Sequence, residues 1–200
     1  MKVLGISGSL REGSYNTTLL RAAAELLPLG VELELYEGLK AIPPYDADDD
    51  VEPAPAAVQR LREAIARADA VLVVTPEYNA SIPGVLKNAL DWASRPHASN
   101  VLRGKPAAVA GTSTGMFGAV WAQAETRKVL TTIGARVLDE ELPVPEADER
   151  FDADGRLADE DLRERYADLL AQLAEAVRDR RAALAAAKAS RFSRPERAAA

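Results

Sequence analysis

Short apolar runs alternate along the chain with longer stretches whose apolar residues recur at helical spacing. The runs that we expect to form strands are residues 3–7, 31–36, 70–75, 106–112 and 135–138. The stretches that we expect to form helices are residues 17–27, 56–67, 83–94, 116–133 and 159–184. Strands that alternate in this way with helices predict a parallel sheet with helices on both of its faces.

Two of these runs, residues 71–74 and 107–110, are continuously apolar, which is typical of central strands buried on both faces. Five strands with a polar loop after the first favour the strand order 2-1-3-4-5. The chain is therefore predicted to be an α/β protein, a flavodoxin-like three-layer sandwich. In such folds ligands bind beyond the carboxyl ends of the strands, where the winding reverses. We expect the loops at residues 8–17, 75–81 and 112–115 to converge there.

The loop after the first strand combines two glycines with hydroxyl, amide and guanidinium side chains. It opens a helix, whose N-terminus offers unpaired backbone N–H groups and a partial positive charge to an anion. Short polar side chains add donors, and a guanidinium can bind two phosphate oxygens at once. The side chains that we expect to contact a phosphate group are Ser9, Arg11, Ser14, Asn16 and Thr17.

Other interpretations of this loop are weaker. Asn16 as an ordinary helix N-cap, with Tyr15 packed on Leu20, leaves Arg11 and the serines unexplained. No Gly-Lys-Ser or Gly-Lys-Thr ends the loop, so it is not a Walker A motif. The glycine spacing does not fit the dinucleotide pattern G-x-G-x-x-G. A low-molecular-weight phosphatase would need a cysteine here, and the chain has none.

The loop after the third strand, Thr-Pro-Glu-Tyr-Asn-Ala-Ser-Ile-Pro-Gly at residues 75–84, is both polar and bulky. Two prolines stiffen it, Tyr78 offers a flat face, and the backbone N–H groups of residues 77–79 can donate to a planar heterocycle. Taken alone, the segment is equally well explained as a turn followed by a helix that begins at proline.

Together the two loops are far more specific. The sequences S-L-R-x-x-S-x-N and T-P-E-Y-N-x-S-I-P-G-x-L-K-N-A-L-D-W closely resemble the NADPH-dependent FMN reductase family, the flavodoxin-like quinone, azo-dye and chromate reductases. Gly-Thr-Ser-Thr-Gly at residues 111–115 matches as well, so the resemblance covers roughly residues 1–175.

The resemblance implies FMN as cofactor and NADPH or NADH as co-substrate. It places the FMN phosphate in the first loop. It also implies that the isoalloxazine ring is bordered by Pro76, Glu77, Tyr78, Asn79, Ser113 and Gly115. Because the flavin performs the redox chemistry, no side chain need act as an acid or base, and we predict no catalytic residue.

The expected function is that of an NAD(P)H-dependent oxidoreductase, which passes hydride through FMN to quinones, azo dyes, chromate or free flavin. The resemblance also implies a homodimer or homotetramer, with Trp92 and Trp121 either in the core or at an interface. One alternative is a flavodoxin-type carrier of single electrons without NAD(P)H turnover. Another is a sensor of a phosphate-bearing ligand that is not a flavin. The stiff aromatic loop favours the reductase.

Composition narrows the remaining choices. The 200 residues carry a formal net charge of −6, which argues against general nucleic-acid binding. The absence of cysteine excludes disulfides, thiol catalysis and thiolate metal sites. The sequence shows no charged-then-apolar leader and no apolar run near ~20 residues. We therefore expect a cytoplasmic protein with neither a membrane nor a nucleic acid as partner.

Two features that suggest metal or acid–base chemistry are weak. Residues 152–155, Asp-Ala-Asp-Gly, are similar to part of a calcium loop, but Arg150 stands where the first ligand is expected. We predict a surface turn. His97 lies in a polar stretch, and we expect a solvated loop residue. No metal site is predicted.

The chain is long enough for one domain with a substantial core. We expect that domain to comprise residues 1–180, with the last helix packed on the sheet through its apolar face. Residues 181–200 are basic and alanine-rich, and we expect them to form a frayed or disordered tail.

Overall fold

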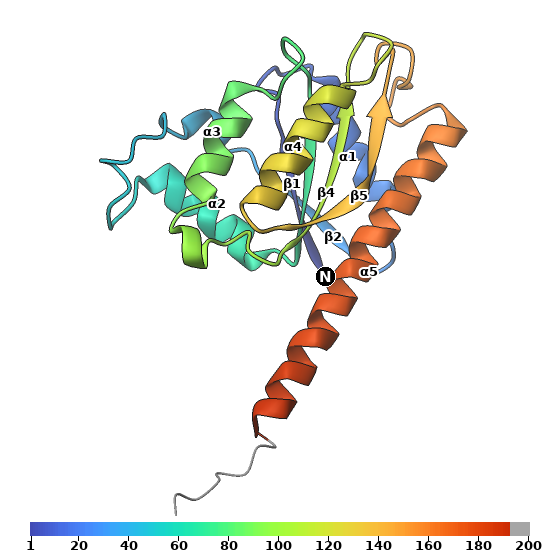
Figure 1. The fold of residues 1–200 in the computed structure, drawn as a ribbon. Helices are drawn as coiled ribbons and strands as arrows, with labels where there is room; N and C mark the ends of the chain where they lie inside the picture. Colours follow the sequence, from blue (N-terminus) through green and yellow to red (C-terminus); the bar gives the residue numbers. More distant parts are fainter. Residues whose placement is uncertain (193–200) are drawn as a thin grey trace, which may run out of the picture.

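The computed structural model describes residues 1–192, with side chains to residue 190. Its core is a sheet of five strands in the order β2-β1-β3-β4-β5, and every neighbouring pair is parallel (Figure 1). The strands are β1 (Lys2–Ser7), β2 (Glu32–Leu35), β3 (Ala70–Thr75), β4 (Pro106–Thr112) and β5 (Arg136–Val144). The predicted fold class and strand order are confirmed.

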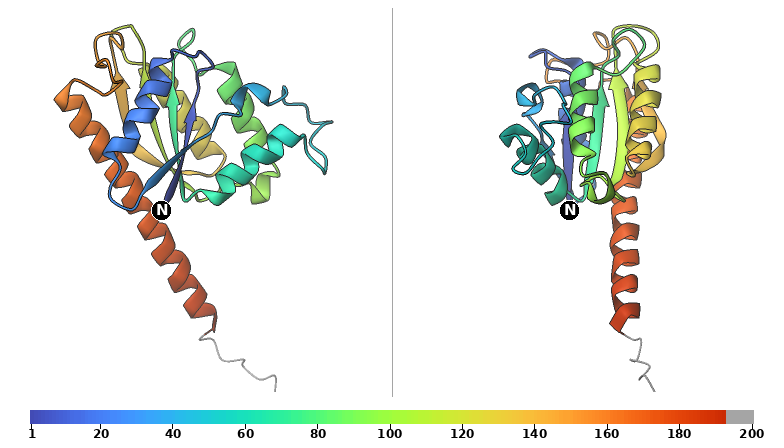
Figure 2. Two further views of the ribbon diagram at one scale, coloured as in Figure 1. Left: turned by 180° about the vertical axis from the view of Figure 1, so that it is seen from behind. Right: turned by 60° about the vertical axis from the view of Figure 1, so that its left-hand side comes forward.

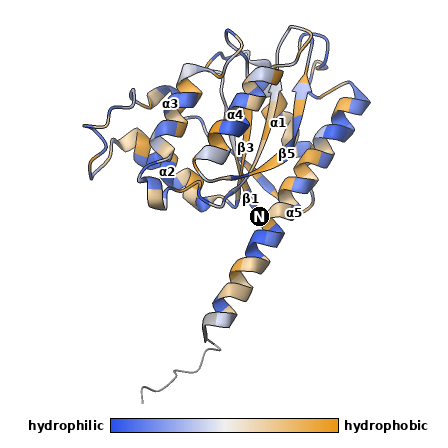
Figure 3. Cartoon of the chain, viewed as in Figure 1, coloured by the Kyte–Doolittle hydropathy of each residue, from blue (hydrophilic) through white to orange (hydrophobic). Residues whose placement is uncertain are grey.

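Helices cover both faces of the sheet (Figure 2). On one face lie α1 (Tyr15–Leu26) and α5 (Glu160–Phe192). On the other lie α2 (Ala56–Arg67), α3 (Gly84–Ala93) and α4 (Val120–Thr132), together with the short helix η1 (Leu39–Ala41). A second short helix, η2 (His97–Ser99), follows α3 and has no buried residue. Helices α2, α3 and α4 carry both hydrophobic and hydrophilic residues, as helices with one buried face must (Figure 3).

The alternation of side chains along a strand explains the two cores. In β3, Val71 and Val73 join the core under α2 and α3, whereas Leu72 and Val74 join the core under α1 and α5. All six residues of β3 and all seven of β4 are buried. The expectation that both strands are central is therefore confirmed.

Strand β5 is longer than predicted, because it continues from residue 138 to Val144. The sequence pattern ends early because Asp139, Glu140 and Glu141 interrupt it. An edge strand needs only one hydrogen-bonded neighbour, and its exposed side chains can be charged. The pairing with β4 also shifts register between Ala107 and Val109.

Helix α4 begins at Val120 rather than at residue 116. Gly118 and Ala119 have positive φ values of 57° and 62°, which break the helical path. Gly118 passes so close to β5 that an added Cβ would lie 2.6 Å from the Val144 nitrogen. The sequence of residues 116–133 did not reveal this, because a single glycine within a helical pattern does not indicate a close approach to another strand.

Helix α5 continues farther than predicted and extends beyond the body of the domain (Figure 1). Residues 181–190 are exposed, and an ion pair of 2.8 Å joins Arg181 to Asp69 where the helix leaves the sheet. Residues 181–192, which we expected to be frayed or disordered, are helical, consistent with the high helix propensity of alanine. Residues 193–200 lie outside the described part of the chain, and a domain limit at residue 180 stays a prediction.

Candidate functional site

The loops after β1, β3 and β4 meet at the carboxyl ends of the strands (Figure 1) and line one cavity of about 180 Å³. The predicted residues that line it are Ser9, Arg11, Ser14, Asn16, Pro76, Glu77, Tyr78 and Ser113. Tyr15, Thr112 and Thr114 also line it and were not predicted. Thr17, Asn79 and Gly115 do not line it. The expected convergence of the three loops is therefore confirmed, and cofactor binding by these residues stays a prediction.

The N-terminus of α1 forms one wall of the cavity. Ser14 is the N-cap residue, is 3% exposed, and makes no capping hydrogen bond with its side chain. In the described part of the chain, the backbone N–H groups of Tyr15, Asn16 and Thr17 have no acceptor. The Arg11 guanidinium lies 5.7 Å from the centroid of the Tyr15 ring. These donors form a site suited to a phosphate group.

Two polar side chains of this loop have structural partners. The Asn16 amide donates to the Thr112 carbonyl oxygen at 2.9 Å, and its Oδ1 accepts from the Thr112 N–H at 3.1 Å. Asn16 thus joins α1 to the end of β4, and its interpretation as an N-cap is wrong because Ser14 has that position. The Thr17 hydroxyl is hydrogen-bonded to Ser7 Oγ at 2.9 Å. Phosphate contacts by these two side chains stay predictions.

The loop after β3 folds into a tight turn. Tyr78 and Ser81 exchange backbone hydrogen bonds of 3.0 and 3.1 Å, and the residues between them, Asn79 and Ala80, have φ values of 54° and 58°. A turn with two positive φ values matches the right-handed twist of hairpin strands, but it is unfavourable for alanine by roughly 1 kcal/mol. The N–H groups of Glu77 and Asn79 have no acceptor within the described residues.

Two carboxylates join this turn to α4. Glu77 Oε2 accepts from the N–H groups of Trp121 at 3.0 Å and of Ala122 at 3.2 Å. Glu125 Oε2 accepts from Ser81 Oγ at 2.6 Å and from the Ile82 N–H at 3.4 Å. A negative charge is favourable at a helix N-terminus, so Glu77 also caps α4. Sequence reasoning missed Glu125, because its partners lie more than 40 residues earlier in the chain.

The loop after β4 is held by hydroxyl groups of its own side chains and by the backbone at the end of β5. Ser113 Oγ donates to the Gly115 carbonyl oxygen at 3.3 Å, and the same oxygen accepts from the Glu146 N–H at 3.3 Å. The Thr112 hydroxyl donates to the Val144 carbonyl oxygen at 2.8 Å. Gly115 therefore shapes the loop from outside the cavity.

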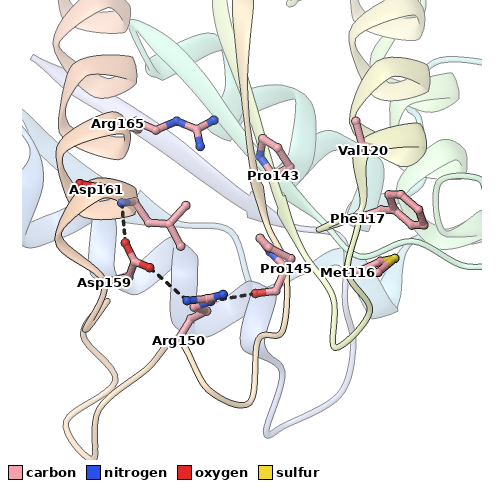
Figure 4. Close-up of a pocket in the computed structure, with 10 residues that line it drawn as sticks. Met116, Phe117, Val120, Pro143, Pro145, Arg150, Asp159, Asp161 and Arg165 are labelled. Carbon is pink, nitrogen blue, oxygen red and sulfur yellow. Dashed lines mark hydrogen bonds and ion pairs between the residues drawn. The ribbon is translucent and has the colours of Figure 1, made fainter.

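A separate cavity of about 450 Å³ lies between the start of α4 and the start of α5 (Figure 4). Met116 and Phe117 stand on one side of it, and Arg150 and Asp159 on the other. Arg150 is already neutralised by ion pairs of 3.0 Å with Asp159 and 2.6 Å with Glu146. Arg165 also lines the cavity and forms no ion pair within the described residues. This cavity therefore offers an apolar wall and one unpaired cationic side chain.

The two weaker candidates lie at the surface. The Asp152 carboxylate accepts from the N–H groups of Asp154 and Arg156, so residues 152–155 form a surface turn. His97 is exposed in η2. Among the residues that the structure describes, no cluster of carboxylates and histidines suits a metal ion. Residues 1–192 also contain no helix with the length and hydropathy that a membrane span requires.

Comparisons with known proteins identify the family. A family model described as NADPH-dependent FMN reductase matches residues 1–149. The chain belongs to this family. An NAD(P)H-dependent FMN reductase of Pseudomonas aeruginosa is 48% identical over 165 residues, which cover 82% of this chain and 88% of the relative. A 2-hydroxy-1,4-benzoquinone reductase of Burkholderia is 39% identical over 182 residues, 90% of this chain and 98% of the relative.

Among solved structures, a flavoenzyme NAD(P)H:acceptor oxidoreductase from Paracoccus denitrificans is similar to this FMN reductase family member with a TM-score of 0.79 and 36% identity. The match covers 90% of this chain and 98% of that one. The predicted family and the flavodoxin-like fold are confirmed.

Proposed function

We propose that this protein is an NAD(P)H-dependent oxidoreductase that holds FMN in the cavity between its three loops and reduces small acceptors. One observation carries the proposal. A helix N-terminus with unpaired N–H groups and a stiff loop with a further unpaired N–H group, that of Glu77, line the same cavity. The first suits a phosphate group, and the second suits the polar edge of a planar ring.

The residues present fit FMN. Ser9, Arg11 and Ser14 would hold the phosphate together with the N–H groups at the start of α1. The Glu77 N–H would donate to the ring edge, and Ser113 would lie at the ring's other edge. When bound, FMN supplies the redox chemistry by accepting hydride from a nicotinamide and passing electrons to an acceptor. The chain's own task is to bind and orient the ring.

Tyr78 is 52% exposed and lines the cavity, so it stands as a wall beside an open face. Such a face leaves room for a planar substrate to stack. The names of several relatives support quinones as acceptors. We propose small quinones as the primary acceptor class, with azo dyes, chromate and free flavin as further candidates.

The test begins with the visible spectrum of the purified protein, followed by anaerobic addition of FMN and NADPH. A flavin spectrum that bleaches with NADPH and recovers with a quinone supports the proposal. A bound flavin that neither NADH nor NADPH reduces would favour a single-electron carrier. A protein that does not bind FMN would leave neither function standing.

We also propose that the protein is a homodimer or homotetramer. Phe117 and Trp121 form an exposed edge-to-face pair, with ring centroids 4.9 Å apart, and Met116 beside them is 70% exposed. Trp92, in contrast, is fully buried and belongs to the core. An exposed group of large apolar side chains is typical of an interface. Size-exclusion chromatography with light scattering tests this, and a monomer would contradict it.

We also propose that the protein is cytoplasmic and has neither a membrane nor a nucleic acid as partner. Fractionation of cells that express the protein would place it, and recovery in the membrane fraction would contradict that location.

A further inference from the structure

A third cavity lies on the other side of the first loop, between that loop and residues 35–40 after β2. Its volume is about 580 Å³, within the usual range for a ligand site. It shares Ser9 and Arg11 with the FMN cavity, so the same loop borders both. Leu10, which is 44% exposed, also lines it.

The lining of this cavity combines an apolar part with a ring. The partly buried Leu35 and Tyr36 supply apolar surface beside Leu10, whereas Leu20 and Leu39 line the cavity but are almost fully buried. Aliphatic side chains with an aromatic ring suit a planar base, which gains contact area and loses little solvation on entering. The apolar part therefore favours a ligand with a heterocyclic base.

Charged side chains line the same cavity. Arg11, Arg21 and Lys40 are cationic, and none of them forms an ion pair within the described residues. In the cavity of Figure 4, by comparison, Arg150 is paired twice, and among the described residues Arg165 is the one cationic side chain of the lining without an ion pair. If Arg11 serves the FMN phosphate, Arg21 and Lys40 remain available for further phosphate groups.

Glu37 adds a hydrogen-bond acceptor to the lining of this cavity. It follows β2 directly and lines the cavity without a partner in the described part of the chain. A carboxylate at this place can accept hydrogen bonds from ribose hydroxyls or from the amino group of adenine. A base, a ribose and phosphate groups are together the parts of an adenosine phosphate.

We infer that this cavity, which we call the adenosine cavity, binds the adenosine phosphate half of NADH or NADPH. The inference rests on the proposed function, because the nicotinamide half would then lie on the open face of the FMN cavity. The dinucleotide would pass over the first loop near Ser9 and Arg11, which line both cavities. Arg21 and Lys40 would hold its phosphates, and Glu37 its ribose or base.

The experiment uses the FMN-loaded protein and the double variant Arg21→Ala/Lys40→Ala. Three hydride donors are compared with a quinone as acceptor: NADPH, NADH and reduced nicotinamide mononucleotide, which lacks the adenosine half. We expect the KM for at least one dinucleotide to rise about tenfold, as for loss of charge-assisted contacts. The kcat/KM for the mononucleotide should stay unchanged. A difference between NADPH and NADH would show whether the 2′-phosphate is among the contacted groups.

A binding measurement provides a readout that does not depend on turnover. Calorimetric titration with 2′,5′-ADP and 5′-AMP should show about tenfold weaker binding of at least one of them to the double variant. Arg178→Ala is the matched control, since Arg178 is exposed on α5, away from this cavity. It should bind both probes like the unmodified protein. FMN affinity should be unchanged in all variants.

Three results with the double variant would overturn the inference. They are unchanged KM values for both dinucleotides, a fall in kcat/KM for the mononucleotide as large as that for the dinucleotides, or weaker FMN binding. Failure of the unmodified protein to oxidise any of the three donors would instead contradict the proposed function. The two failures are therefore distinguishable.

Discussion

Glu125 Oε2 accepts a 2.6 Å hydrogen bond from Ser81 Oγ, and so ties the middle of α4 to the turn that borders the FMN cavity. That turn contains Ala80 at a φ of 58°, a conformation that costs an alanine roughly 1 kcal/mol. The turn is therefore kept in shape by its surroundings, and Glu125 supplies the closest of the side-chain contacts from α4.

We expect Glu125→Ala to weaken FMN binding about tenfold, because the turn loses a charge-assisted hydrogen bond and relaxes. Glu125→Gln keeps an acceptor of the same shape and should restore most of the affinity. Quenching of flavin fluorescence on binding measures both. Glu175→Ala, an exposed carboxylate on α5, is the control for loss of charge alone. Unchanged FMN affinity in Glu125→Ala would show that the turn holds its shape without this residue.

The central sheet could be predicted from the sequence because β3 and β4 are apolar throughout, so pattern and burial agree. The end of β5 could not, because an edge strand accepts charged residues on its exposed side. The loops after β1 and β3 could be predicted to line the cavity, because each carries its polar residues in one short contiguous motif. Glu125 and the partner of Asn16 were not, because those contacts join residues 44 and 96 positions apart.

Asn16 offers a second test. Asn16→Ala removes two buried hydrogen bonds and leaves the Thr112 backbone without partners, at a cost of about 3 kcal/mol in the free energy of unfolding. We also expect weaker FMN binding, because α1 and the end of β4 would no longer be held together at the cavity. Urea unfolding and FMN titration measure the two effects.

Asn88→Ala is the matched control for Asn16→Ala. Asn88 also makes two hydrogen bonds with backbone, to Tyr45 and Pro43, but it lies outside the cavity. It should lower stability and leave FMN affinity unchanged. Equal losses of affinity in both variants would mean that FMN binding merely follows stability.

Gly118 and Gly115 form a natural pair for comparison. Gly118 has a φ of 57°, and an added Cβ would lie within 2.8 Å of three backbone atoms of residues 143–145. Gly115 has ordinary φ, and an added Cβ would meet only Ser113 Oγ, at 3.7 Å. We expect Gly118→Ala to cost about 3 kcal/mol or more, and Gly115→Ala less than about 1 kcal/mol. Thermal unfolding of both variants in the absence of FMN measures the difference. Similar melting temperatures for the two variants would contradict the prediction.

Lys105 should make stability depend on pH. The side chain is 4% exposed and donates to the Ala68 carbonyl oxygen, and burial lowers the pKa of Lys105 to about 8, with Arg180 adding to the shift and Asp69 opposing it. Below pH 8 both folded and unfolded chains carry the proton, and the folded state bears the full cost of the buried charge. Between pH 8 and the unfolded pKa near 10.5 only the unfolded chain is protonated, so stability rises with pH.

Burial also raises the pKa of Tyr166, so the free energy of unfolding falls at high pH in any variant that keeps this tyrosine. Comparison with Lys105→Met removes this contribution, because it is the same in both proteins. From pH 7 to pH 10, the free energy of unfolding of the unmodified protein should rise relative to the variant by on the order of 2 kcal/mol. Urea unfolding at intervals of pH measures the difference between the two proteins. A difference that stays constant over this range would show that Lys105 titrates in the folded state as it does in the unfolded chain.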